Sequence, residues 1–192
     1  MNVVKAAKTT YLVTSSLLLI FGVAILIFRP SDSLLRILTG ACFLLIGVTK
    51  LLGFFSNDLY KLAFQFDLAL GFLTLIVGCV LLIRSGILLQ TTASIAGIYV
   101  VVDGLFKIQT AFDAKKFGMN KWFTILVAAI LVDVVGVLTL FDPFGVLNPS
   151  SLMVLISVAF ILNGALNIWT TAYTVRVKAK KKHLEEKYEN YL

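Results

Sequence analysis

The sequence predicts an all-α integral membrane protein with six transmembrane helices, arranged as three parallel helical-hairpin repeats. One reason is composition: 59% of the 192 residues are hydrophobic and 14% are charged, whereas globular chains carry about 25% charged residues. A second is the recurrence of apolar runs of about twenty residues, the length that spans a hydrocarbon core of roughly 30 Å. The third is a set of glycines that recurs along the chain with nearly constant spacing.

The apolar runs and the polar segments between them define six spans. The predicted spans are 11–28, 36–55, 64–83, 87–106, 122–141 and 151–173. Proline or glycine, which end helices, occurs in the turns at 29–33, 84–86 and 142–150. The spans form one membrane domain, residues 1–175, which a charged tail over residues 176–192 follows.

The basic residues predict the orientation of these spans. If the N-terminus is cytoplasmic, fourteen of the seventeen Lys and Arg residues face the cytoplasm, and only Arg29, Arg36 and Arg84 lie outside. Cytoplasmic loops of membrane proteins carry such an excess, so we expect both termini in the cytoplasm. The basic first half of the tail is expected to touch anionic lipid headgroups. It borders a span and has no folded basic face, so no nucleic-acid partner is expected.

The spans also form an internal repeat, with units at 11–55, 64–112 and 122–173. The first helix of each unit carries a glycine six or seven residues before a polar turn; these are Gly22, Gly78 and Gly136. The second helix carries a glycine followed three residues later by Lys50, Lys107 or Asn167; these are Gly47, Gly104 and Gly164. All units start and end on one side. Parallel repeats of this kind make a secondary transporter with inverted repeats less expected, without excluding one.

Each of the six glycines has a small residue seven positions earlier; these are Ser15, Gly71, Ala129, Gly40, Gly97 and Ser157. Seven residues make about two helical turns, so each pair lies on one helix face. Small residues let helix backbones approach closely in lipid, where no hydrophobic drive brings helices together. The pattern therefore predicts helix packing through these glycines.

Asp103 and Lys107 are four residues apart and face one side of a helix. Lys107 matches Lys50 in the repeat, and we expect both lysines at the cytoplasmic ends of their helices, with side chains reaching the headgroups. Asp103 corresponds to Ile46 and Asn163, so the repeat does not explain its carboxylate. Polar pairing and transport are the two roles considered for Asp103.

Asp133 lies near the middle of the fifth predicted span, where an aspartate costs about 2.5–3.5 kcal/mol on the insertion scale. Its counterparts in the repeat are Leu19 and Leu75, so the scaffold does not require a carboxylate. One interpretation is a proton or cation site. The other is a hydrogen bond that joins helices, for example to Asn163, Thr74 or a backbone carbonyl group.

Two further polar features have simpler interpretations. Asp67 lies near the start of the third span, where the helix dipole favours a negative charge, and no further role is assigned to it. Asn163 and Asn167 lie one turn apart and are expected to join helices by hydrogen bonds.

The sequence contains none of the common catalytic or nucleotide-binding motifs, so we expect no enzyme activity and no cofactor. The single histidine, His183, is in the tail, and Cys42 and Cys79 lie in apolar runs without a CxxC pattern. We therefore expect no metal site.

The six spans, the hairpin repeat and the segments GVTKLLGFF and DGLFKIQTAF resemble the HdeD-like membrane proteins. That family consists of a short repeated hydrophobic unit of unknown biochemical activity. The resemblance covers the chain up to about residue 176 and implies a protein of the bacterial plasma (inner) membrane. The family name also implies a link to acid resistance.

We expect a non-enzymatic multi-pass protein with a structural or stress-response role, including acid tolerance. Its expected surroundings are the lipid bilayer, and self-association into a homo-oligomer or a protein partner is the expected mode of action. The alternative is a small proton- or ion-linked transporter or channel that uses Asp103 and Asp133. A water-filled cavity shared by these two carboxylates would favour transport, whereas a dry seam would argue against it.

Overall fold

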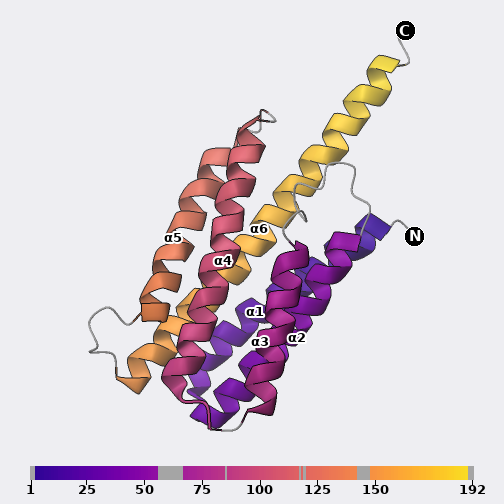
Figure 1. Ribbon diagram of the computed structural model, residues 1–192. Helices are drawn as coiled ribbons and strands as arrows, with labels where there is room; N and C mark the ends of the chain where they lie inside the picture. The colour runs from indigo at the N-terminus through magenta and orange to yellow at the C-terminus, as the bar shows by residue number, and fades with distance from the viewer. Residues whose placement is uncertain are drawn as a thin grey trace.

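The computed structural model describes residues 3–55, 67–84, 86–116, 118, 120–141 and 148–189. Within these residues the chain forms six α-helices and no strand, which confirms the predicted all-α fold. The helices are α1 (Val3–Phe28), α2 (Asp32–Phe55), α3 (Asp67–Ile83), α4 (Leu89–Lys116), α5 (Trp122–Phe141) and α6 (Pro149–Glu189). Figure 1 shows them side by side in one bundle, with the end of α6 extending beyond it.

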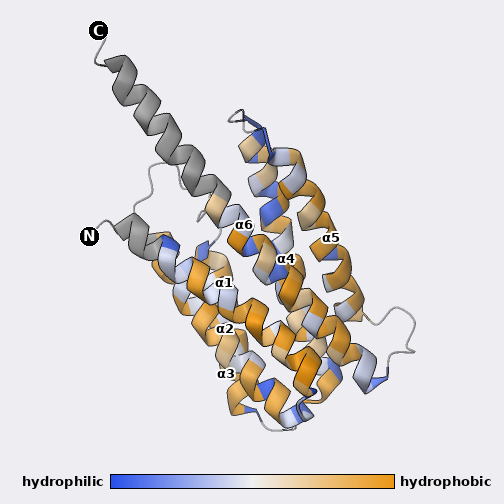
Figure 2. Ribbon diagram, turned by 180° about the vertical axis from the view of Figure 1, so that it is seen from behind, coloured by the Kyte–Doolittle hydropathy of each residue, from blue (hydrophilic) through white to orange (hydrophobic). Residues whose placement is uncertain are grey.

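Five of the described helices are long and apolar enough to cross a membrane, and α3 is an apolar helix of 17 residues. Hydrophobic residues colour most of the ribbon in Figure 2, and many large apolar side chains are exposed on the outside of the bundle. Ile20, Ile76 and Leu131, for example, are each about 60% exposed. An apolar exterior of this kind is suited to lipid. The chain is a multi-pass helical membrane protein.

The start of α1 and the end of α6 lie at the same end of the bundle (Figure 1). This arrangement follows from an even number of helices that alternate in direction along the bundle. The connections at residues 29–31 and 86–88 lie at the opposite end. The three sequence units therefore run in the same direction. Which membrane face the termini occupy stays a prediction from the basic residues.

Four helices, α1, α2, α4 and α6, extend further than the apolar runs that predicted them. The fourth span was expected to end at residue 106, but α4 continues to Lys116, where Gly118 follows with φ +71° and donates its amide to the Lys115 carbonyl at 2.9 Å. Glycine in this left-handed conformation is a common helix terminator. The helix ends where its backbone geometry changes, because polar residues can continue the hydrogen-bonding pattern after hydrophobicity has fallen.

The helices pack as three tight antiparallel pairs, namely α2 with α3, α4 with α5, and α1 with α6. Each pair joins the second helix of one sequence unit to the first helix of another. The last pair joins the two ends of the chain and closes the three units into a ring. The repeat in the sequence is therefore not the unit that packs most closely.

Glycines make these close contacts possible. A Cβ atom added at Gly40 would lie 3.1 Å from the Gly78 carbonyl oxygen, and one added at Gly47 would lie 2.9 Å from the carbonyl oxygen of Gly71. Equivalent positions face each other across the other seams: Gly97 and Gly136, Gly22 and Ser157, and Gly164 and Ser15. All six glycines assigned to helix packing, Gly104 included, lie in the seams of the three tight pairs.

Candidate functional site: a buried charge network

Four charged side chains meet inside the bundle, and we call Lys50, Asp67, Asp103 and Lys107 the charge network. Their side chains are only 3–8% exposed. Lys50 comes from α2, Asp67 is the first residue of α3, and Asp103 and Lys107 lie on α4. Two positive and two negative charges therefore share one buried region. Burial of charges in a protein is tolerable when they are paired and hydrogen-bonded in this way.

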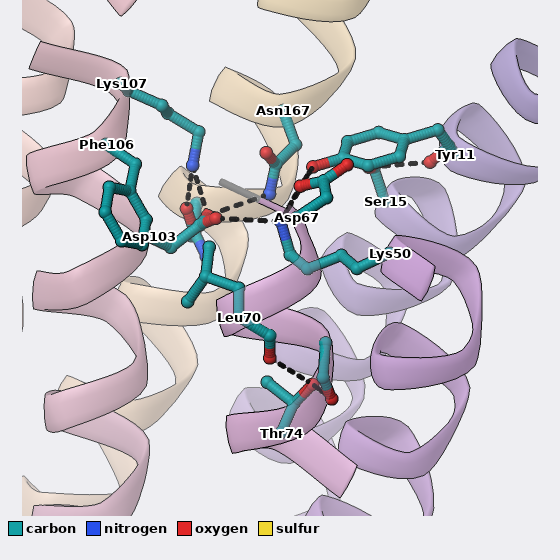
Figure 3. Close-up of polar contacts among 12 residues, drawn as sticks. Tyr11, Ser15, Lys50, Asp67, Leu70, Thr74, Asp103, Phe106, Lys107 and Asn167 are labelled. Carbon is teal, nitrogen blue, oxygen red and sulfur yellow. Dashed lines mark hydrogen bonds and ion pairs between the residues drawn. The ribbon is translucent and has the colours of Figure 1, made fainter. Parts of the chain in front are cut away.

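Asp103 lies at the centre of the network (Figure 3). Its Oδ1 accepts a hydrogen bond from Lys50 Nζ at 3.1 Å, and its Oδ2 accepts one from Lys107 Nζ. Asn167 of α6 also donates to Oδ2 at 3.3 Å. Both carboxylate oxygens are thus engaged, and one side chain joins three helices.

Lys50 uses all three of its N–H donors inside the bundle. It donates to Asp103, to Asp67 Oδ1 at 3.2 Å and to the hydroxyl oxygen of Tyr11 at 2.7 Å. The Tyr11 hydroxyl in turn donates to Asp67 Oδ1 at 3.5 Å. Tyr11 adds α1 to the helices that the network joins.

Lys107 is not at a helix end, contrary to the expectation from sequence. Because α4 continues for nine residues beyond it, its ammonium group stays inside the bundle, where it donates to Asp103 and to Asn163 Oδ1 at 2.8 Å. Lys50 is likewise 3% exposed rather than at the headgroups. The physical reason is the same for both: a nearby carboxylate removes the need for the lysine to reach water.

Asp67 was interpreted as a simple helix-start residue, and the structure shows that it belongs to the network. The repeat contains a signal that identifies it. Tyr11 and Asp67 are 56 residues apart, as are Gly22 and Gly78, so they occupy equivalent positions. Both contact Lys50. Polar residues at equivalent positions of successive units therefore converge at the centre of the ring.

Asp133 lies outside the network. Its carboxylate packs directly against Gly104 in the seam between α4 and α5. Leu75 packs against Gly47, and Leu19 against Gly164, at the equivalent points of the other seams. Asp133 thus occupies the position at which the other two repeat units have leucine.

The hydrogen bonds expected for Asp133 are not formed among the described residues. Both carboxylate oxygens are buried and have no hydrogen-bond partner there. The Thr74 hydroxyl donates to the Leu70 carbonyl instead, and the Asn163 Nδ2 donor is itself without a hydrogen-bond partner among the described residues. Asp133 also makes no described hydrogen bond to Asp103. No direct hydrogen bond therefore joins the two carboxylates in the described part of the chain.

A cavity of about 50 Å³ adjoins the charge network. Its described lining consists of Tyr11, Lys50, Asp67, Leu70, Asp103, Phe106, Lys107, Thr110, Asn167, Thr170 and Thr171. A single water needs roughly 10–15 Å³ measured in this way, so the cavity has room for a few water molecules. Asp133 is not among the described lining residues. Asp103 lines a polar cavity, whereas Asp133 packs in the seam between α4 and α5.

The repeated segments match a known protein-family model. The family model described as "Short repeat of unknown function (DUF308)" matches residues 13–83 and 69–141. The chain belongs to the DUF308 family. Comparison with curated proteins and with solved structures gives no match.

The two DUF308 matches start 56 residues apart, at residues 13 and 69, which is also the separation of Tyr11 and Asp67. The first match contains the pair of α2 and α3, and the second extends through the pair of α4 and α5. The pair of α6 and α1, which closes the ring, lies partly outside the matched segments.

Proposed function

We propose that this DUF308 protein is a non-enzymatic, HdeD-like protein of the bacterial inner membrane that serves in tolerance of acid or a related stress. In this proposal its termini are cytoplasmic and the charge network is its functional element. The observation that carries the proposal is the burial of two lysines and two aspartates at positions where the third repeat unit has no charge.

Comparison of the repeat units indicates that the helical scaffold does not require these charges. At the position of Tyr11 and Asp67 the third unit has Ile125, which is 1% exposed. At the position of Lys50 and Lys107 it has Asn167. The helices of this unit pack in the same ring without a charge at either position. Charges that a scaffold does not need, and that are expensive inside a membrane, are by default candidates for function.

The dimensions of the site support a role other than catalysis. Small-molecule sites have volumes of about 300–1,000 Å³, whereas this cavity measures about 50 Å³. The ionic groups that line it are bonded to one another and not arranged around a substrate-sized space.

The balance of charge supports a response to acid. A proton taken up by one carboxylate would leave two lysines with a single counter-ion, and an uncompensated buried charge is strongly destabilising. The network joins α1, α2, α3, α4 and α6. Uptake of a proton at this point would therefore loosen contacts between most helices of the bundle.

Complementation in a deletion strain tests the proposal. Survival in acid and cytoplasmic pH would be measured with wild-type protein, with Asp103→Leu combined with Lys107→Met, and with a surface control. The double variant removes one acid and one base, so the remaining pair of Lys50 and Asp67 stays neutral. The control is Asp113→Leu with Lys116→Met, an ion pair of 3.2 Å in which Lys116 is 77% exposed.

Wild type and control should restore survival, and the network variant should not, although it reaches the membrane in equal amount. Unchanged survival and unchanged cytoplasmic pH in the deletion strain would contradict the acid-tolerance role.

A second candidate function is proton- or cation-linked transport, which the polar cavity favours. The version that uses Asp103 and Asp133 together has less support, because only Asp103 lines that cavity. Reconstituted vesicles that contain a pH-sensitive dye would test it. Proton flux that persists when Asp103→Asn and Asp133→Asn are combined would contradict it.

We further propose that segment 176–192 contacts anionic lipid headgroups and that the chain self-associates in the bilayer. The charges of the tail support the first point, since clusters of basic residues beside a span attract anionic lipids. Binding of the tail peptide to vesicles with and without anionic lipid tests it, and subunit counting in nanodiscs tests the second.

A further inference from the structure

We propose that Asp67 is the proton-binding group of the charge network, and that water in the adjoining cavity carries the proton to it. The inference rests on the proposed function and names the residue through which that function responds to acid. Two observations support it: one oxygen of Asp67 is buried without a partner, and the same side chain lines the cavity.

The two network carboxylates differ in how their oxygens are used. Asp103 accepts hydrogen bonds from two ammonium groups and one amide, so a proton on either oxygen would displace an existing bond. Asp67 accepts through Oδ1 only, and its Oδ2 has no hydrogen-bond partner in the described part of the chain. A buried acceptor without a donor is unfavourable. A proton on Oδ2 therefore disturbs the fewest contacts.

Water in the cavity can supply hydrogen bonds to the polar groups near Asp67 Oδ2 that lack a partner. The Lys107 ammonium has three N–H donors, of which two are used by Asp103 and Asn163. Lys107 and Asp67 are both among the residues that line the cavity. A buried water needs two to four polar partners. A short chain of two or three waters in this volume would satisfy both groups and connect them.

The proton transfer is balanced within this site. A hydronium ion in the cavity gives its proton to Asp67 Oδ2 and becomes water, while Asp67 becomes a neutral carboxylic acid whose O–H donates to that water. Lys50 then keeps its bonds to Asp103 and Tyr11. The net charge of the network rises by one unit, which is the change that would loosen the bundle.

The titratable groups that face Asp67 come from three helices: Tyr11 of α1, Lys50 of α2, and Asp103 and Lys107 of α4. The described lining from α6 is Asn167, Thr170 and Thr171, none of which titrates near neutral pH. Asp133 of α5 is the competing carboxyl group, because both of its oxygens lack described partners. It packs against Gly104 and is not among the described residues that line the cavity.

Infrared difference spectroscopy tests the assignment on full-length protein in nanodiscs, taken from about pH 8 to about pH 4, a range that includes shifted carboxyl groups. The wild-type protein should show the C=O band of a carboxyl group that becomes protonated. The band should be lost in Asp67→Asn, remain at a changed frequency in Asp67→Glu, and remain unchanged in Asp133→Asn and in the exposed control Asp32→Asn. Because water reaches the group, the band should shift promptly in D₂O.

If Asp67→Asn does not fold, Asp67→Glu and Asp133→Asn still decide the question through the frequency and the survival of the band. Absence of any band, loss of the band in Asp133→Asn, a band that Asp67→Glu does not shift, or a band that D₂O does not shift would each overturn the inference. The proposed function is judged separately by survival in acid. If the band is assigned to Asp67 but deletion of the protein leaves survival in acid unchanged, Asp67 would still be the proton-binding group, and the acid-tolerance role would be rejected.

Discussion

Lys50 Nζ lies 3.1 Å from Oδ1 of Asp103, although the two residues are 53 positions apart in the sequence and belong to different units of the repeat. Lys107 binds the other oxygen of the same carboxylate. Asp103 is therefore shared by two lysines that occupy equivalent positions in successive units. This relationship makes the network depend on the closed ring of helices and not on any one helix.

Substitution Asp103→Asn should lower the free energy of unfolding by about 3–5 kcal/mol, because it leaves two buried lysines with one counter-ion. Circular dichroism during unfolding of the micelle-bound protein measures the change. Combining Asp103→Leu with Lys107→Met should recover most of the loss, since the remaining charges are balanced. The control Asp113→Asn, whose partner Lys116 is exposed, should change stability by no more than about 1 kcal/mol. Equal effects at Asp103 and Asp113 would contradict this account.

Substitution Gly104→Ala should destabilise the bundle by about 1–3 kcal/mol through overpacking. Glycine to alanine usually stabilises a helix, but a Cβ atom here would collide with the Asp133 carboxylate. Shortening the facing side chain by Asp133→Ala should therefore reverse part of the loss in the double variant. If the two substitutions change the free energy of unfolding additively, the side chains at 104 and 133 do not contact each other.

Substitution Asp133→Leu should raise stability by about 1–3 kcal/mol, because it removes buried oxygens without described partners. Leucine is the residue that packs over the equivalent glycines of the other two seams. Thermal unfolding in the same micelles measures the effect. Val134→Leu on the exposed face beside it should be nearly neutral, and a destabilised Asp133→Leu protein would mean that the carboxylate is bonded in the membrane.

Cysteines at Gly22 and Ser157 should form a disulfide, because α1 and α6 are in close contact at these positions. The background would carry Cys42→Ala and Cys79→Ala, since both native cysteines are free. Protection of the new thiols from a maleimide mass tag after mild oxidation reports the bond. A control pair at Gly22 and Leu131, which is exposed on α5, should stay labelled. Equal labelling of the two pairs would contradict closure of the ring.

Reporter fusions test the orientation that the basic residues predict. A reporter after Leu192 should be active in the cytoplasm, and one inserted between residues 142 and 147 should be active outside it. The loop at 142–147 lies outside the described residues. This prediction therefore rests on the distribution of basic residues and on the position of the start of α1 and the end of α6 at one end of the bundle. The reverse pattern would overturn the orientation.

Local sequence information was sufficient for the number and class of the elements. The apolar runs correctly located six helices, and the seven-residue spacing of small residues located the positions that face one another across the seams. These features depend on composition and on helical periodicity, which are properties of neighbouring residues. The end of α4 was wrong by ten residues, because hydropathy falls before Gly118 changes the backbone conformation.

The sequence by itself determined a helical membrane protein with a repeated unit, and it identified Asp103 as a residue that the repeat does not explain. Only the tertiary structure decided that α1 pairs with α6, that Lys50 and Lys107 turn inward, and that Asp67 joins the network while Asp133 packs against Gly104 between α4 and α5. The reason is physical. A charge inside a membrane is stable only beside its counter-charge, and here the counter-charges come from distant units that meet when the ring closes.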